Sequence, residues 1–474
     1  MWRLANVRYI GLAASALLAV VAWLGGALPG GDLHSTPISV ARGPHGAFIL
    51  GGWLVGTVVQ AYAWWVLRDR IPSARWAMVT AGLWTLPFLV VPPFGSRDVY
   101  SYACQGYLYV HGLSPYQNGV GALPCPWIES VSTIWRDTAA PYGPLFVLIS
   151  GGAVRLGGGS LAAVVVIFRV AAVAGLAAVV LGLPALARRC GVPTGRALWV
   201  ALAGPLVGAH LIGGPHNDAL MIGLVVAGLA VAAAFRHPAA RAGAGALLGL
   251  AVAVKVTAVV VVPFAVLLVL ARPLRLWPAV RAGGLLAGGA LAAMAGVTAA
   301  SGLGFGWIGG MLNTRDLVQF TSPPTAVGMT LTYAGQLVDH GFNAVPVVRV
   351  LATALFVVVL AVLCLRAARS DAPVAGALRG AGLAMAATVA LAPYFHPWYA
   401  MWPLAVMGAT TLRTGLVMAV ATVSSLLVLP DGGGLARFVK FPGAPLLTVL
   451  MLVLLIRYLR RRAEPAPTAP LGVP

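Results

Sequence analysis

Long runs of apolar residues restrict this chain to one environment. A helix that crosses a bilayer needs about 20 apolar residues, and such runs recur along the chain, for example at 46–67 and 160–187. Of the 474 residues, 60% are hydrophobic and only 9% are charged. Soluble enzymes, Rossmann domains, coiled coils and disordered chains all need more polar residues than this. The sequence therefore predicts an all-α polytopic membrane protein.

Basic clusters between the apolar runs predict how the helices cross the membrane. Arg and Lys gather in the cytoplasmic loops of membrane proteins. Here the net charge of +20 arises from such clusters, for example at 68–75, 188–196 and 457–462, and we expect no binding to nucleic acid. Both termini are then cytoplasmic, and we expect about 13 or 14 spans.

This orientation divides a single transmembrane domain, 1–462, into spans and two outer loops. The loops at 93–143 and 301–344 lie on the extracytoplasmic side. The run 144–156 is too short to span and is expected to form an interfacial or re-entrant helix. The proline-rich tail, 463–474, is predicted to be a disordered cytoplasmic end.

The first outer loop carries a candidate catalytic residue. Asp98 lies just beyond an apolar run, beside Arg97 and among tyrosines, of which we expect Tyr102 to contact a sugar. A carboxylate at the membrane rim can act as a general base toward a sugar hydroxyl. Alternatively, Asp98 caps the following helix and pairs with Arg97.

The same loop contains two of the four cysteines. Cys104 and Cys125 could form a disulfide in an oxidising compartment, or remain two buried thiols. No Cys or His spacing typical of a metal site occurs in the sequence.

A second motif, GGPHNDALM (213–221), precedes another apolar run. His216 and Asp218 could hold an acceptor, with Asp218 orienting hydroxyls or pairing with Arg. The alternative is that Asn217 or Asp218 simply caps the helix that follows.

A third motif, LAPYFHPWYAMWPL (391–404), combines His396 with Trp398 and Tyr399. Aromatic rings provide flat faces on which a sugar can stack. An aromatic belt at the membrane interface would also account for this cluster.

Three basic residues are candidates for binding a lipid phosphate. Lys255 and Arg169 lie within apolar runs, where a charge is costly and is a functional candidate by default. Either could instead pair with a loop carboxylate, and Arg169 could be structural. Lys255 interrupts the run 242–271, which is basic at both ends and is expected to go partway across and return as two short helices. Arg315 could bind phosphate oxygens bidentately or pair with Asp316.

Four motifs in this order identify a known family. SRDVYSYACQGYLYVHGLSPY (96–116), PYGPLF (141–146), GGPHNDALM and PYFHPWYAMWPL together resemble the actinobacterial polyprenol-phosphate-mannose-dependent α-1,6-mannosyltransferases, which are GT-C membrane glycosyltransferases. The resemblance implies a GT-C architecture with juxtamembrane helices near 100–110 and 144–156.

The resemblance also implies an activity. The donor would be polyprenyl-phosphate mannose and the acceptor an α-1,6-mannan glycolipid of the lipomannan or lipoarabinomannan type. Transfer would occur at the extracytoplasmic face of the plasma membrane, without a metal or other cofactor. The catalytic carboxylate of the family maps onto Asp98.

Such a reaction inverts the configuration at the transferred sugar. It needs one base to deprotonate the acceptor 6-hydroxyl, which we expect to be Asp98. The departing lipid phosphate needs cationic and hydrogen-bond stabilisation, for which the candidates are His396, Lys255 and Arg315. Trp398 or Tyr399 would stack on a mannose.

The competing interpretation is a transporter or lipid flippase. A bundle of many helices with broken segments and intramembrane charges also describes those proteins. Against it, the hydropathy pattern shows no inverted repeat, and most acidic residues lie in the outer loops. A structural scaffold would not need acids clustered with aromatics on one side.

Overall fold

A computed structural model describes residues 4–270, 275–312 and 318–463. Within these ranges the chain is helical, with no β-structure except one isolated bridge between Val428 and Gly434. Seven of the described helices are long and apolar enough to cross a membrane, or eight if one bent pair counts as a span. The predicted all-α, multi-pass membrane fold is thereby confirmed.

The long helices match the longest apolar runs of the sequence. They are α1 (Leu4–Gly25), α3 (Gly46–Leu67), α8 (Leu161–Arg189), α13 (Leu276–Ser301), α16 (Val345–Ala368), α17 (Pro373–Leu391) and α20 (Lys440–Ala463), the last extended by η8 (Leu435–Val439). The bent pair consists of α9 (Thr194–Leu202) and the π-helix η4 (Val207–Gly213), which meet at 61°.

Fewer helices qualify as spans than the about 13 or 14 expected, because several apolar runs fold as short helices. Examples are α4 (Ala74–Thr85), α10 (Asp218–Ala234), α18 (Met401–Thr410) and α19 (Gly415–Ser425). In the first case α4 gives way at Pro87 to a 3₁₀ helix, η1 (Leu86–Leu89). Hydropathy averages over a window and does not detect such breaks. The remaining short helices include α2 (Pro37–Arg42), α6 (Thr133–Arg136), α14 (Gly306–Leu312) and α15 (Pro323–Gly335).

Contacts divide the chain into two compact units, where the sequence predicts a single transmembrane domain. The larger unit comprises Met1–Asp316, Val357–Val389 and His396–Leu435, and the smaller comprises Leu317–Phe356, Ala390–Phe395 and Ala436–Pro474. In the smaller unit α15 packs on α20 around Ala326, Met329, Val345 and Ala444. Every candidate site residue that the structure describes belongs to the larger unit.

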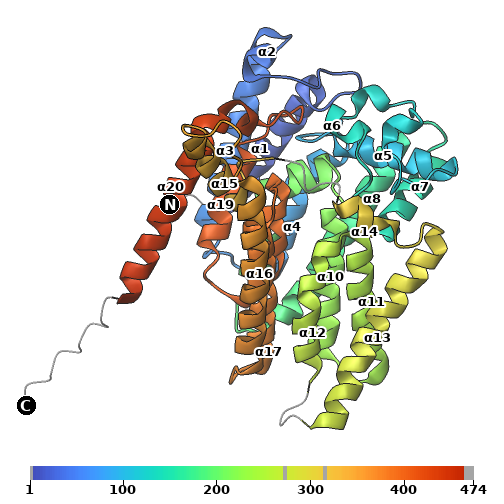
Figure 1. The fold of residues 1–474 in the computed structure, drawn as a ribbon, viewed down its shortest axis with the longest axis vertical. Coiled ribbons are helices and arrows are strands. Elements are labelled where there is room, and N and C mark those ends of the chain that lie inside the picture. The colour runs from blue at the N-terminus through green and yellow to red at the C-terminus, as the bar shows by residue number, and fades with distance from the viewer. Residues whose placement is uncertain (1–3, 271–274, 313–317, 464–474) are drawn as a thin grey trace, which may run out of the picture. The chain divides into compact units, whose positions relative to one another are not determined.

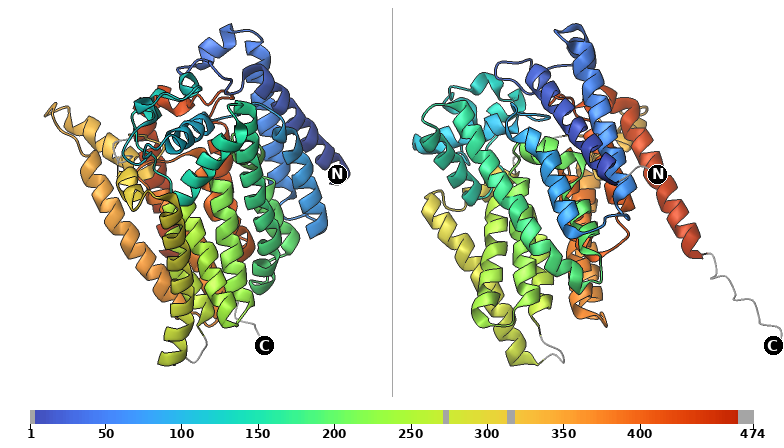
Figure 2. Two further views of the ribbon diagram at one scale, coloured as in Figure 1. Left: turned by 90° about the vertical axis from the view of Figure 1, so that its right-hand side faces the viewer. Right: turned by 180° about the vertical axis from the view of Figure 1, so that it is seen from behind.

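Within the larger unit, α8, α10, α11 (Pro238–Val254) and α13 pack side by side in that order (Figure 2). Small residues permit the close approach, as is common between membrane helices. A Cβ at Gly223 of α10 would lie only 2.2 Å from the carbonyl oxygen of Gly175 on α8. This packing supports the end of α10 at which Asp218 lies.

The two helices expected in the first outer loop are present. α5 (Asp98–Val110) and α7 (Pro144–Gly157) pack against each other and lie with α6 at one end of the larger unit (Figure 1). They occupy the positions that the sequence suggested for juxtamembrane helices.

The run 242–271 is broken at Lys255, as expected. α11 ends at Val254, Lys255 has an extended backbone, and the chain continues as η5 (Val256–Val261) and α12 (Val262–Val269). Nη1 of Arg236, just before α11, donates to the carbonyl of Leu268 at 3.3 Å. The end of α12 therefore returns to the end of the bundle at which α11 begins, and Lys255 lies at the turning point.

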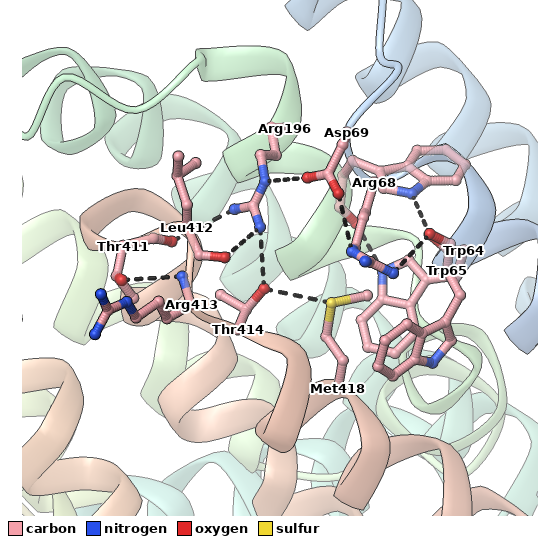
Figure 3. A network of polar contacts seen from close by, with 11 residues as sticks. Trp64, Trp65, Arg68, Asp69, Arg196, Thr411, Leu412, Arg413, Thr414 and Met418 are labelled. Carbon is pink, nitrogen blue, oxygen red and sulfur yellow. Dashed lines mark hydrogen bonds and ion pairs between the residues drawn. The ribbon is translucent and has the colours of Figure 1, made fainter. Parts of the chain in front are cut away.

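A polar network ties three other turns of the larger unit together (Figure 3). Nε of Arg196 lies 2.9 Å from Oδ1 of Asp69, which follows α3. Nη2 of the same guanidinium donates to the carbonyl of Leu412 at 2.8 Å and to Oγ1 of Thr414 at 3.2 Å. Arg196 thus holds the start of α9 against the turn between α18 and α19.

Candidate active site

The segment that leads into α5 is held by backbone contacts. Gly95 has φ of +68° and donates its N–H to the carbonyl of Pro430 at 2.7 Å. A Cβ at Gly95 would lie 2.7 Å from the ring of His210, so a larger residue would not fit. Arg97 donates to the carbonyls of Leu28 at 3.1 Å and Asp32 at 3.3 Å.

Because Arg97 is bound to these backbone carbonyls, the partner of Asp98 is not Arg97, its neighbour in the sequence. No ion pair joins it to Arg97 in the described part of the chain, and Oδ2 of Asp98 instead lies 3.6 Å from Nε2 of His216. The side chain of Asp98 is 15% exposed, whereas that of His216 is fully buried. Nδ1 of His216 lies 2.6 Å from the carbonyl oxygen of His210.

The surroundings of Asp98 favour its ionised form. Burial alone would raise the pKa of this carboxyl. The contact with His216, the charge that His396 carries at low pH and the charge of Lys255 outweigh that effect, so the pKa of Asp98 lies below the ordinary value. Near neutral pH Asp98 is a carboxylate, which is the form that a general base requires.

Asp218 lies next to this pair in sequence but has its own partners. Its side chain is fully buried, and its Oδ1 accepts from Nζ of Lys255 at 2.8 Å and from Nε1 of Trp402 at 2.6 Å. The Lys255 ammonium also lies 4.4 Å from the ring centroid of Tyr399. The basic partner of Asp218 is thus Lys255 and not an Arg, while Oδ2 of Asp218 has no hydrogen-bond partner among the described residues.

The aromatic motif at 391–404 forms one wall of the site. Trp398 contacts the ring of His216 at 3.7 Å between centroids and stacks on His396 at 4.9 Å. Trp398 and Tyr399 are each only 6% exposed, so little ring area is open to a sugar. Burial lowers the pKa of His396 to about 4 although Asp98 opposes that shift, and His396 is therefore a neutral hydrogen-bonding group near pH 7.

The remaining candidates lie in different settings. Tyr102 is 1% exposed and packs edge-on against Tyr142, Phe146 and Phe168, which makes it part of the supporting wall. Arg169 donates to backbone carbonyls that include those of Leu89 at 3.1 Å and Ile212 at 3.2 Å, in agreement with a structural role. Arg315 lies outside the described residues.

A disulfide joins Cys104 of α5 to Cys125, with their Cα atoms 5.4 Å apart. It ties the helix that begins with Asp98 to the loop that follows it. Among the described residues no group of three or more His, Cys, Asp or Glu side chains could hold a metal ion.

Sequence reasoning missed two residues that contribute to the site. Trp402 lies in the aromatic motif at 391–404, and no pattern in that motif predicts that its indole binds Asp218. His210 was overlooked, although its carbonyl holds His216. The available signal was a histidine within an apolar run, a few residues before the Gly213–Gly214 turn.

Comparison with known proteins supplies a family. Residues 8–271 match the family model described as alpha-(1->6)-mannopyranosyltransferase, N-terminal domain, and residues 324–457 match that of the MptB C-terminal domain. A probable alpha-(1->6)-mannopyranosyltransferase of Mycolicibacterium smegmatis is 33% identical over 466 residues, which cover 88% of this chain and 82% of that protein. Alpha-(1->6)-mannopyranosyltransferase A of Mycobacterium tuberculosis is 31% identical over 463 residues, covering 93% and 88%. No solved structure matches the chain.

Proposed function

The chain belongs to the α-(1→6)-mannopyranosyltransferase family, and from this premise we propose that it transfers mannose from polyprenyl-phosphate mannose to the 6-hydroxyl of an α-1,6-mannan glycolipid. It is a mannosyltransferase with membrane helices, so it takes a sugar donor and an acceptor and works in a lipid bilayer. The proposed acceptor is of the lipomannan or lipoarabinomannan type.

The observation that most directly supports this proposal is the carboxylate of Asp98 at the start of α5, which is kept ionised beside His216. In the proposed reaction Asp98 takes the proton of the acceptor 6-hydroxyl, and the oxygen attacks C1 of the donor mannose. The bond from C1 to the phosphate oxygen breaks, and polyprenyl phosphate leaves with the electron pair. Attack opposite the leaving group converts the β-linked donor into an α-linked product.

The leaving phosphate gains negative charge that the site must stabilise. Lys255 has three N–H donors, of which one is directed to Asp218, so the others can serve a phosphate oxygen. His396 would contribute a neutral hydrogen bond, and Arg315 of the second outer loop a further cation. The proposed chemistry needs no metal, and chelation should leave the transfer rate unchanged.

We place the site on the extracytoplasmic side of the plasma membrane, with both chain termini in the cytoplasm. Support comes from the basic clusters, such as Arg457 to Arg462 at the end of α20, which favour the cytoplasm. The Cys104–Cys125 disulfide fits an oxidising compartment on the side of α5.

Radiolabelled mannose transfer to a short α-1,6-mannoside, measured in membranes that contain the protein, tests the proposal. Asp98→Asn should lower kcat by about 10²- to 10⁴-fold, the usual contribution of a general base. Asp137→Asn is the matched control, because Asp137 is an exposed carboxylate of the same loop. Near-normal transfer by Asp98→Asn would refute the assignment of the base, and no transfer by the wild type would refute the activity.

A further inference from the structure

Each of the two ring nitrogens of His216 faces an oxygen atom that can only accept a hydrogen bond. Nδ1 lies 2.6 Å from the carbonyl oxygen of His210, and a carbonyl oxygen can only accept a hydrogen bond. Nδ1 must therefore carry a proton. The neutral ring then presents a bare, basic Nε2 on its other side.

This basic nitrogen is directed at Asp98. Nε2 of His216 lies 3.6 Å from Oδ2 of the Asp98 carboxylate, and the His216 side chain is fully buried. It has no hydrogen-bond partner within the described ranges. A carboxylate also only accepts, so two acceptors face each other and together can hold one proton.

The groups around this pair do not repel a positive charge on His216. Lys255 lies on the connection from α11 to η5, and its ammonium is neutralised by Asp218 of α10 at 2.8 Å. His396, which stacks on Trp398, is neutral near pH 7. The ring of His210 on η4 lies 6.2 Å from that of His216. No unbalanced cation among these neighbours opposes a positive charge on His216.

We propose that His216 accepts the proton that Asp98 abstracts, so that the two side chains act as one base. The proposal rests on the function proposed above. The O–H bond of the acceptor breaks and its proton goes to the Asp98 carboxylate, while the acceptor oxygen bonds to C1 and the phosphate departs with the electron pair. The proton then moves to Nε2 of His216, which restores the carboxylate and creates an ion pair. Closure from 3.6 Å to a charge-assisted contact of about 2.8 Å would stabilise it.

The proton finally returns to solvent by way of Asp98, which is the partly exposed member of the pair. His216 thus acts through Asp98 and does not itself need to touch the substrate. Its role differs from that of a residue that only orients the carboxylate, and substitution can separate the two.

Two amide side chains at position 216 distinguish a residue that accepts the proton from one that only orients Asp98. His216→Asn places an N–H near Nδ1 and can keep the bond to the His210 carbonyl, while His216→Gln places one near Nε2 and can donate to Asp98. Neither amide can accept a proton. Both variants should keep the KM for donor and lose on the order of 100-fold in kcat.

The pH profile of kcat provides a second readout. In His216→Asn only protonation of the Asp98 carboxylate stops transfer, whereas in the wild type a proton bound anywhere on the pair does so, and the acid limb of the profile should therefore move to lower pH in His216→Asn. His111→Gln is the matched control, since Nδ1 of His111 also lies 2.8 Å from a backbone carbonyl, that of Tyr107, but its ring is exposed and pairs with no described carboxylate. A His216→Gln enzyme with wild-type kcat would show that His216 only positions Asp98, and would overturn the proposal.

A measurement without substrate separates this inference from the proposed function. In the detergent-solubilised protein labelled with ¹⁵N-histidine, the His216 resonance, assigned by its loss in His216→Gln, should report a proton on Nδ1 at neutral pH. A proton on Nε2 and none on Nδ1 at neutral pH would overturn the proton pair. The expected proton position in a protein that transfers no mannose would overturn only the proposed function.

Discussion

The buried ion pair between Lys255 and Asp218 allows stability and catalysis to be tested apart. Nζ of Lys255 lies 2.8 Å from Oδ1 of Asp218, and the two side chains are 11% and 0% exposed. Replacing Lys255 with Met leaves a buried carboxylate whose only hydrogen-bond donor among the described side chains is the Trp402 indole. Removing one partner of such a pair costs about 3–5 kcal/mol. At about 2 °C per kcal/mol for a large chain, Tm should fall by about 6–10 °C.

The double variant Lys255→Met/Asp218→Asn should recover much of this loss. The amide oxygen of Asn can still accept from Trp402, and no unpaired charge remains in the protein interior. We expect a coupling energy of about 2–3 kcal/mol, the upper range for residues in contact. Thermal unfolding in detergent, followed by tryptophan fluorescence, measures Lys255→Met, Asp218→Asn and the double variant.

Mannose transfer should not recover in the double variant, because the proposed donor to the leaving phosphate is still absent. Glu129→Gln is the control, since the Glu129 side chain that pairs with Arg136 at 3.3 Å is 79% exposed and the pair should contribute less than about 1 kcal/mol. The reasoning fails if Lys255→Met is as stable as the wild type, or if the double variant is no more stable than Lys255→Met.

Three further results are expected. Removing the disulfide by Cys104→Ser/Cys125→Ser, which opens a loop with a sequence separation of 21, should cost about 3 kcal/mol and lower Tm; an unchanged Tm would contradict this. Arg196→Met leaves the carbonyl of Leu412 without its guanidinium donor and should cost about 1–3 kcal/mol, seen as a lower Tm with unchanged KM for donor. Because His396 has a folded-state pKa of about 4 against an ordinary 6.5, the unfolded chain binds its proton first, so stability should fall as pH drops from about 6.5 to about 4. His396→Gln should flatten that dependence of Tm on pH, and an equally steep profile would show that another group causes it.

The residues that the sequence marked do meet in space. Asp98, His216, Lys255 and His396 come from four separate segments, and the charges of the other three each affect the pKa of Asp98. The motifs made this possible to predict because the bias of basic residues toward the cytoplasm assigns the loops that carry them to the same side of the membrane. Their pairing was harder to predict, since Asp98 had Arg97 beside it in the chain and yet faces His216.

The amino-acid sequence by itself determined the environment of the protein, its helical class and the segments that form the site. These properties follow from local composition, because a run of apolar residues must lie in lipid or in a core wherever it packs. Only the tertiary structure decided which side chains became partners. Asp218 and Trp402 are 184 positions apart, and no local pattern joins them. A buried charge takes the partner that packing brings within hydrogen-bond distance, and that choice depends on where α10, α11 and α18 come together.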